Sequence, residues 1–102
     1  MPEKNATLVV KLHKRISIGI KKTTLSSISD VAKETLHEEE LAERAEGNEK
    51  FKLKKLNVDG FDAELYFDVK DMQNLKLEEV INLIDKLQAN DKRIDVSFKF
   101  EE

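Results

Sequence analysis

The chain has 102 residues, of which 39% are hydrophobic and 38% are charged. This length provides one modest hydrophobic core, so we expect residues 1–102 to form a single domain. The formal charge of −3 gives no general attraction to phosphate backbones or anionic bilayers, which argues against nucleic-acid and membrane partners.

The first predicted element is a β-strand, because apolar residues occupy nearly every second position from Leu8 to Ile20. A regular strand of that length would span ~43 Å at ~3.3 Å per residue, more than twice the usual length. We therefore expect an interruption at His13-Lys14-Arg15. A β-bulge is favoured there, since a tight hairpin normally uses Gly, Asn or Asp. Two short strands joined by a hairpin are the alternative.

The second predicted element is a helix from about Ile28 to Glu46. Its apolar face begins at Ile28 but fails in the middle, where Thr35-Leu36-His37-Glu38 has the form of a capping box. We therefore expect a kink or a restart near residues 35–38. Gly47-Asn48 is a typical helix end.

A β-hairpin is predicted around Asp59-Gly60, which lies between two runs of alternating apolar residues. Both residue types enter the left-handed backbone region that a type I′ turn requires. With this pair as the turn, Val58 would lie opposite Phe61 and Leu56 opposite Ala63.

The incoming strand of this hairpin changes phase at Lys54-Lys55, whereas the outgoing strand keeps one phase to Val69. A β-bulge at the two lysines would return Phe51 and Leu53 to the buried face. It would also place Lys52 opposite Tyr66 on the polar face.

The last two predicted elements are a helix and a strand. The helix would be capped by Asn74 and ended by Asn90. Its amphipathic stripe consists of Leu77, Val80, Ile81, Ile84 and Leu87. From Ile94 to Glu101 apolar and polar residues alternate, which predicts a strand with one buried side.

The predicted order is strand, helix, strand, strand, helix, strand. That order is typical of an α+β, ferredoxin-like βαββαβ two-layer sandwich, a four-stranded antiparallel sheet with two helices on one face. The lysines of the second strand suit a sheet edge, where they discourage pairing with another chain. The fold by itself implies no activity.

No catalytic or metal-binding constellation is evident, so the sequence predicts a protein that is not an enzyme and needs no cofactor. The chain has no cysteine, which excludes disulfides and thiolate chemistry. His37-Glu38-Glu39-Glu40-Leu41 begins like a zinc-binding helix but has leucine where the second histidine should stand. No nucleophile elbow surrounds a serine, and three glycines form no phosphate-binding loop.

Three surfaces are candidates for binding. A loop before the first helix could hold a phosphate or carboxylate, although an ordinary solvated loop has the same composition. It consists of Lys21, Lys22, Thr23 and Thr24. A small apolar strip on that helix, flanked by glutamates, could meet a partner, or could pack on the sheet after the kink. The strip consists of Leu41, Ala42 and Ala45, and the flanking residues include Glu38, Glu39 and Glu40. The polar sheet face has Tyr66 as its one aromatic residue, too few for RNA binding by base stacking.

These features favour a non-catalytic protein-interaction or assembly module that forms homo-oligomers. Self-association could use the long first strand, an exposed sheet edge or the polar sheet face. The alternatives are a small regulatory domain that binds an anion at Lys21–Thr24, and an acidic inhibitor that uses Glu38–Glu40. A cytoplasmic location is expected, since residues 1–5 contain no apolar signal segment and no run approaches the ~18 apolar residues of a membrane span.

Overall fold

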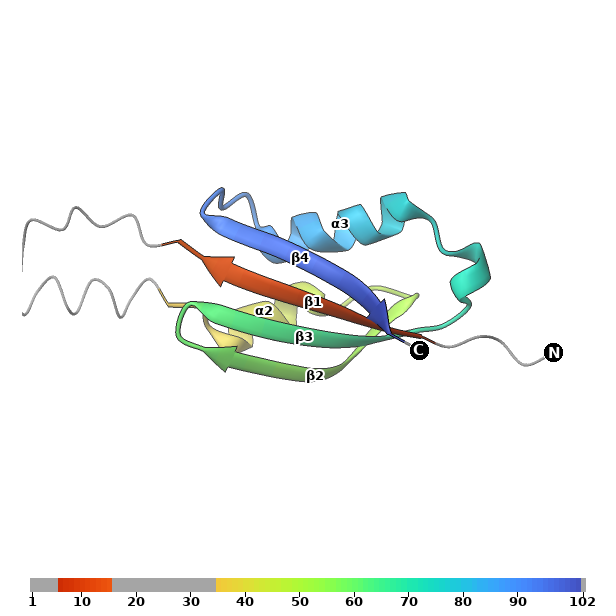
Figure 1. Ribbon diagram of the computed structural model, residues 1–102, viewed down its shortest axis with the longest axis horizontal. Coiled ribbons are helices and arrows are strands. Elements are labelled where there is room, and N and C mark those ends of the chain that lie inside the picture. Colours follow the sequence, from red (N-terminus) through yellow and green to blue (C-terminus); the bar gives the residue numbers. More distant parts are fainter. Residues whose placement is uncertain (1–5, 16–34, 102) are drawn as a thin grey trace, which may run out of the picture.

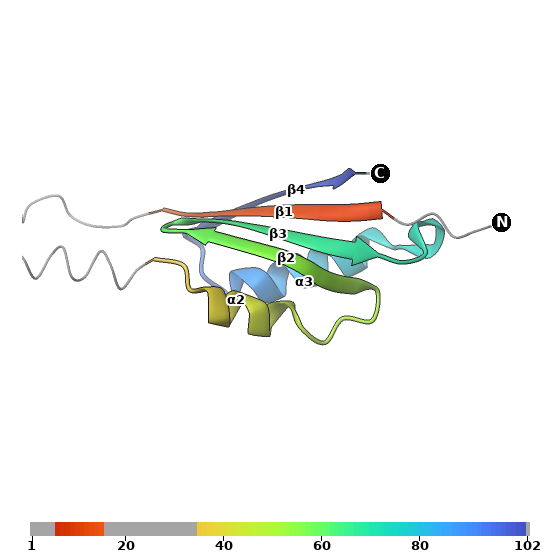
Figure 2. The ribbon, with the colours of Figure 1, turned by 90° about the horizontal axis from the view of Figure 1, so that it is seen from below.

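The computed structural model describes residues 6–15 and 35–101. Its strands are β1 (Ala6–Lys14), β2 (Phe51–Asp59), β3 (Asp62–Val69) and β4 (Ile94–Glu101). Its helices are α2 (Glu38–Ala45), α3 (Leu77–Gln88) and the short 3-10 helix η1 (Met72–Asn74). The strands form one antiparallel sheet in the order β2-β3-β1-β4 (Figure 1). Helices α2 and α3 both cover the same face of that sheet (Figure 2). The predicted α+β, ferredoxin-like two-layer architecture is therefore confirmed.

The core lies between the sheet and the two helices. Strands β1 and β3, at the centre of the sheet, bury the alternate residues that face the helices, and Phe67 of β3 packs edge-to-face on Phe51 at 6.3 Å between ring centroids. The core residues of the two central strands are Leu8, Val10, Leu12, Ala63, Leu65, Phe67 and Val69. The helices contribute Leu41, Ala45, Val80, Leu83 and Leu87.

Strand β1 is regular to its end. Its register against β3 runs unbroken to His13 and its register against β4 to Lys14. The Arg15 N–H then donates to the Arg93 carbonyl at 2.8 Å. The expected bulge at His13-Lys14-Arg15 is therefore wrong, and no hairpin interrupts the strand at this place. The predicted continuation to Ile20 lies outside the described residues.

The hairpin joins β2 to β3 as predicted, but its turn is displaced by one residue. Asp59 pairs with Asp62, so Gly60 and Phe61 are the central residues and Val58 lies opposite Ala63. Of these two central residues, Gly60 alone has a positive φ, +63°, which is the sign pattern of a type II′ turn. The carbonyls of both turn residues have partners elsewhere in the fold: Lys14 N–H donates to Phe61 at 2.8 Å, and Leu36 N–H to Gly60 at 2.9 Å.

The bulge in β2 is confirmed between Leu53 and Lys55. It returns Phe51 and Leu53 to the helix-covered face, where they lie opposite Val69 and Phe67. Because the turn is displaced, Lys55 and not Lys52 lies opposite Tyr66.

Helix α2 begins at Glu38, which confirms a helix start in the region where a restart was expected. The residue before it, His37, is the N-cap and makes no side-chain capping bond. Thr35 is therefore not the cap of this helix, and the capping-box prediction is wrong. The helix ends at Ala45, shortly before Gly47, whose φ is +86°. Residues 28–34 of the predicted helix lie outside the described residues.

Helix α3 begins later than predicted. Its N-cap is Lys76, whereas Asn74, the predicted cap, is the last residue of η1. The other end agrees with the sequence, because Ala89 and Asn90 both adopt left-handed conformations after Gln88.

One ion pair ties the start of β2 to α3: Lys50 Nζ lies 2.9 Å from Glu79 Oε1. The hydrogen bond from Lys50 lowers the pKa of Glu79 below its ordinary 4.5, although burial partly opposes that shift. A lowered folded-state pKa means that the pair stabilises the fold above about pH 4.5 and loses its effect as the pH falls through the lowered value.

We therefore expect Glu79→Gln to reduce the melting temperature at pH 7 and to have less effect at pH 3. The measurement is thermal unfolding by circular dichroism across that range, with Glu78→Gln, an exposed carboxylate on the same helix, as the control. An equal loss at both pH values would show that the Glu79 charge does not stabilise the fold.

Candidate functional site

The predicted anion site, Lys21, Lys22, Thr23 and Thr24, lies outside the described residues. The apolar strip of α2 packs in the core, as one of its two interpretations predicted: Leu41 has 1% and Ala45 2% of its surface exposed. The flanking Glu38, Glu39 and Glu40 are exposed at the start of the helix.

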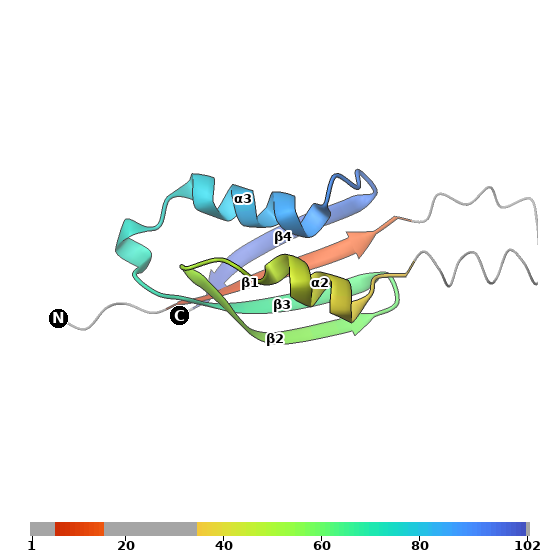
Figure 3. The ribbon, with the colours of Figure 1, turned by 180° about the vertical axis from the view of Figure 1, so that it is seen from behind.

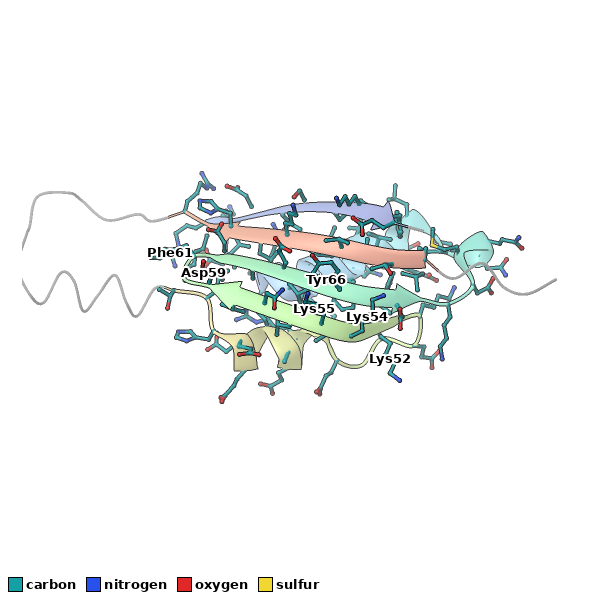
Figure 4. The ribbon with its side chains drawn as sticks, turned by 60° about the horizontal axis from the view of Figure 1, so that its bottom comes forward. Lys52, Lys54, Lys55, Asp59, Phe61 and Tyr66 are labelled. Carbon is teal, nitrogen blue, oxygen red and sulfur yellow. The ribbon has the colours of Figure 1, made fainter. Side chains whose placement is uncertain are left out.

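Tyr66 stands near the middle of the open sheet face (Figure 4). Its hydroxyl donates to Glu64 at 2.7 Å, and Lys55 Nζ lies 5.4 Å from the ring centroid. The bond to Glu64, together with burial, raises the pKa of the phenol. Val9 faces the same side, yet it is only 2% exposed, because it lies between its cross-strand neighbours Tyr66 and Lys99. The tyrosine therefore covers part of the sheet rather than standing free to stack on a base.

A hollow of about 390 Å³ on the open face contains a pair that sequence reasoning missed, His13 and Asp62, whose Nδ1 and Oδ1 atoms lie 2.7 Å apart. Both side chains are more than half exposed, so water screens the pair. Within residues 6–15 and 35–101, no group of three His, Asp or Glu side chains could hold a metal ion.

The feature that stands out is a set of exposed apolar side chains on α3. Leu77 is 66% exposed and Ile81 is 47% exposed, whereas Leu83, which was left out of the predicted stripe, is completely buried. The buried stripe of α3 consists of Val80, Leu83 and Leu87. Leu77 and Ile81 were expected in that stripe, and this expectation is wrong.

The contacts of α3 show which way its exposed apolar residues face. On one side of the helix, Glu79 binds Lys50 and Lys86 Nζ donates to the Glu46 carbonyl, so this side faces α2 and the start of β2. On the opposite side Gln88, seven residues after Ile81, donates to the Ile94 carbonyl at 3.0 Å. Residues seven apart share a helix face, so Ile81 lies on the β4 side. Figure 3 shows α3 beside β4 and α2 beside β2.

Two further exposed apolar residues lie on β4. Phe98 and Phe100 pair with Val10 and Leu8 of β1, which places them on the helix-covered face. Each is nevertheless 40% exposed, and their rings pack edge-to-face at 6.2 Å between centroids. The predicted buried side of β4 is therefore covered at Ile94 and left partly open toward Glu101.

These exposed residues all lie on the β4 side of the molecule, and we call them the apolar edge. Its members are Leu77, Ile81, Phe98 and Phe100. Helix α3 and β4 are joined by a short turn and run in opposite directions (Figure 1). Gln88 lies beside Ile94. With rises of ~1.5 Å per helical residue and ~3.3 Å per strand residue, Ile81 is therefore about level with Ser97 and Leu77 with Lys99.

The two edges of the described sheet differ in chemistry. The β2 edge carries a bulge and three lysines, Lys52, Lys54 and Lys55, which are devices that prevent pairing with another strand. The β4 edge is eight residues long, has no register shift and carries two phenylalanines, Phe98 and Phe100, among its last four residues. Only the β4 edge is therefore suited to pair with a further strand.

Sequence reasoning missed the apolar edge, although α3 carries a signal for it. Six apolar residues, Leu77, Val80, Ile81, Leu83, Ile84 and Leu87, cover an arc of about 160° at 100° per residue, wider than the ~100° stripe that one buried face needs. Such a wide arc indicates a second apolar contact beyond the core.

Comparisons with known proteins do not assign the chain: no protein-family model matches it, and no curated protein does. Neither helix in the described ranges is long and apolar enough to cross a membrane.

Proposed function

We propose that this protein is a non-catalytic protein-interaction module that self-associates through the β4 edge. The observation that carries the proposal is the apolar edge, where four large apolar side chains lie exposed beside an unprotected strand. Contiguous apolar surface on a folded domain typically marks a binding site. An open strand edge adds unpaired backbone groups that another strand can satisfy.

The chemistry of the rest of the described surface supports the same proposal. The open sheet face carries paired charges, as in Lys54–Asp68 at 3.1 Å. Such paired, solvated charges contribute little to binding. The anion-binding alternative depends on residues outside the described ranges, and no particular contact favours the acidic-inhibitor alternative. Both stay predictions.

The test is the oligomeric state. We expect the mass of the 11.8 kDa chain to approach twice that value in sedimentation experiments as its concentration rises. Phe98→Lys should raise the dissociation constant by about 100-fold or more, because the charge is placed twice in an apolar interface. Phe61→Lys makes the same replacement in the hairpin turn, away from β4, and should leave the dissociation constant unchanged.

A wild-type chain that stays monomeric from micromolar to millimolar concentration would contradict the proposal. So would a Phe98→Lys variant that associates as the wild type does. Circular dichroism of both variants checks that each is folded.

A further inference from the structure

We infer that the self-association is a two-fold symmetric dimer in which β4 pairs with β4 of a second copy, antiparallel and in a register centred on Ser97. This inference rests on the proposed function and adds the occupant of the edge and its alignment. It follows from the charge pattern of β4, which selects the register; the free backbone groups of Val96 and Phe98 and the position of Ile81 on α3 are compatible with that register.

The free backbone groups define the usable part of the edge. The Arg93 carbonyl accepts from Arg15, so it points toward β1, and the next carbonyl, that of Ile94, points outward to Gln88. Directions alternate along a strand, so Val96, Phe98 and Phe100 direct their N–H and C=O groups to the open edge. Ile94 is already satisfied, because its N–H donates to the Asp91 carbonyl at 3.1 Å.

The charge pattern selects one register. When Ser97 lies opposite Ser97 of the second copy, Asp95 lies opposite Lys99 twice, and each pair joins opposite charges across the interface. On the other face Val96 lies opposite Phe98, so apolar side chains meet and their free backbone groups pair. Arg93 then lies opposite Glu101, which again joins opposite charges.

The neighbouring registers lack this complementarity. Centring the pair on Phe98 places Asp95 opposite Glu101 of the second copy, which opposes two negative charges twice. Centring the pair on Lys99 places the Lys99 residues of the two copies opposite each other. Centring it on Val96 places Arg93 of one copy opposite Lys99 of the other. Like charges directly opposite one another are unfavourable. The Ser97 register is the one of these four without such a clash.

Existing ion pairs extend the charge alternation across the proposed interface. Within one chain Asp95 lies 3.3 Å from Arg15 Nε, and Lys99 lies 3.0 Å from Glu101. In the Ser97 register the order Arg15, Asp95, Lys99, Glu101 alternates in sign across the two copies.

The helices fit the same symmetry. Because Ile81 is about level with Ser97, a two-fold axis through Ser97 brings the Ile81 side chains of both copies to the same height. Leu77, four residues before Ile81, then lies level with Asp85 of the second α3. The sheet would continue through eight strands, with the two α3 helices on the same face.

The first test is a cysteine cross-link, for which the chain is suited because it contains no cysteine. Ser97→Cys should form a disulfide-linked dimer under mild oxidation, since residues opposite each other at a non-hydrogen-bonded position have Cα atoms ~4.5 Å apart. Lys99→Cys is the matched control. In the Ser97 register residue 99 of one copy lies four positions, ~13 Å along the strand, from residue 99 of the other, so this variant should not cross-link.

The second test exchanges charges. Asp95→Lys and Lys99→Asp should each raise the dissociation constant about ten-fold at low ionic strength, because each variant places like charges opposite one another twice. An equimolar mixture of the two variants pairs lysine with aspartate at both places and should dimerise nearly as well as the wild type. Effects on the monomer alone do not produce this rescue.

The outcomes separate the register from the proposed function. A monomeric wild type would overturn both, and would indicate that a different partner covers the edge. A dimer that cross-links through Phe98→Cys rather than Ser97→Cys, and that Asp95→Lys strengthens, would have the Phe98 register. It would overturn this inference while leaving self-association in place.

Discussion

Replacing Phe67 with alanine is expected to lower the free energy of unfolding by about 3–5 kcal/mol. The side chain is completely buried in β3, lies opposite both Leu8 and Leu53, and contacts the Phe51 ring at 6.3 Å between centroids. Its removal leaves a cavity between the sheet and the helices. The neighbouring side chains are closely packed and cannot move far enough to fill it. Small domains have total stabilities of about 5–15 kcal/mol, so this loss is a large fraction.

Urea denaturation followed by circular dichroism measures this loss, at concentrations where the chain is monomeric. Phe98→Ala is the matched control, because that ring is 40% exposed and belongs to the edge. It should cost less than half as much as Phe67→Ala. A cost below about 1 kcal/mol for Phe67→Ala would show that the core does not pack around this ring.

The second large effect is expected on α3, where Leu83→Ala should cost about 2–5 kcal/mol and Ile81→Ala less than about 1 kcal/mol in the monomer. Leu83 is completely buried, whereas Ile81 is 47% exposed. The same Ile81→Ala replacement should weaken self-association, because Ile81 belongs to the apolar edge.

The two α3 variants are compared by urea denaturation at low concentration and by sedimentation at high concentration. If Ile81→Ala destabilised the monomer more than Leu83→Ala, the helix would bury the face that the sequence stripe indicated. If neither variant changed the dissociation constant, α3 would not contribute to the interface.

Self-association also links these measurements to concentration. A ligand that binds only the folded state raises its apparent stability, and here the ligand is a second copy of the chain. The melting temperature of the wild type should therefore rise with concentration, while that of Phe98→Lys should not. Stability differences between core variants are comparable only at a fixed, low concentration.

Much of the fold follows from local patterns in the sequence. Period-two alternation placed β1, β3 and β4, and the change of phase at Lys54-Lys55 located the bulge in β2. The bulge was predictable because a strand with one buried face cannot shift by one residue without turning its apolar side chains to water. Such rules depend on neighbours in the chain, which the sequence displays.

Local residue preferences did not predict the position of the hairpin turn. Asp59-Gly60 satisfies the residue preferences of a type I′ turn, yet the central pair is Gly60 and Phe61. The displaced turn directs the Phe61 and Gly60 carbonyls to N–H groups of Lys14 and Leu36, which are distant in sequence. Backbone partners from other segments therefore decided between two turns of similar local preference.

The sequence by itself determined the order of the elements, the antiparallel hairpin and the face of each central strand, because the period of apolar residues dictates these locally. Only the tertiary structure decided which apolar residues stay in contact with water. Phe98 and Leu8 lie on the same side of the sheet, but Phe98 stands on an edge strand with no neighbour beyond it among the described strands, and Leu8 stands at the centre. Burial depends on what packs alongside, so the apolar edge emerged only when the strands and α3 were placed together.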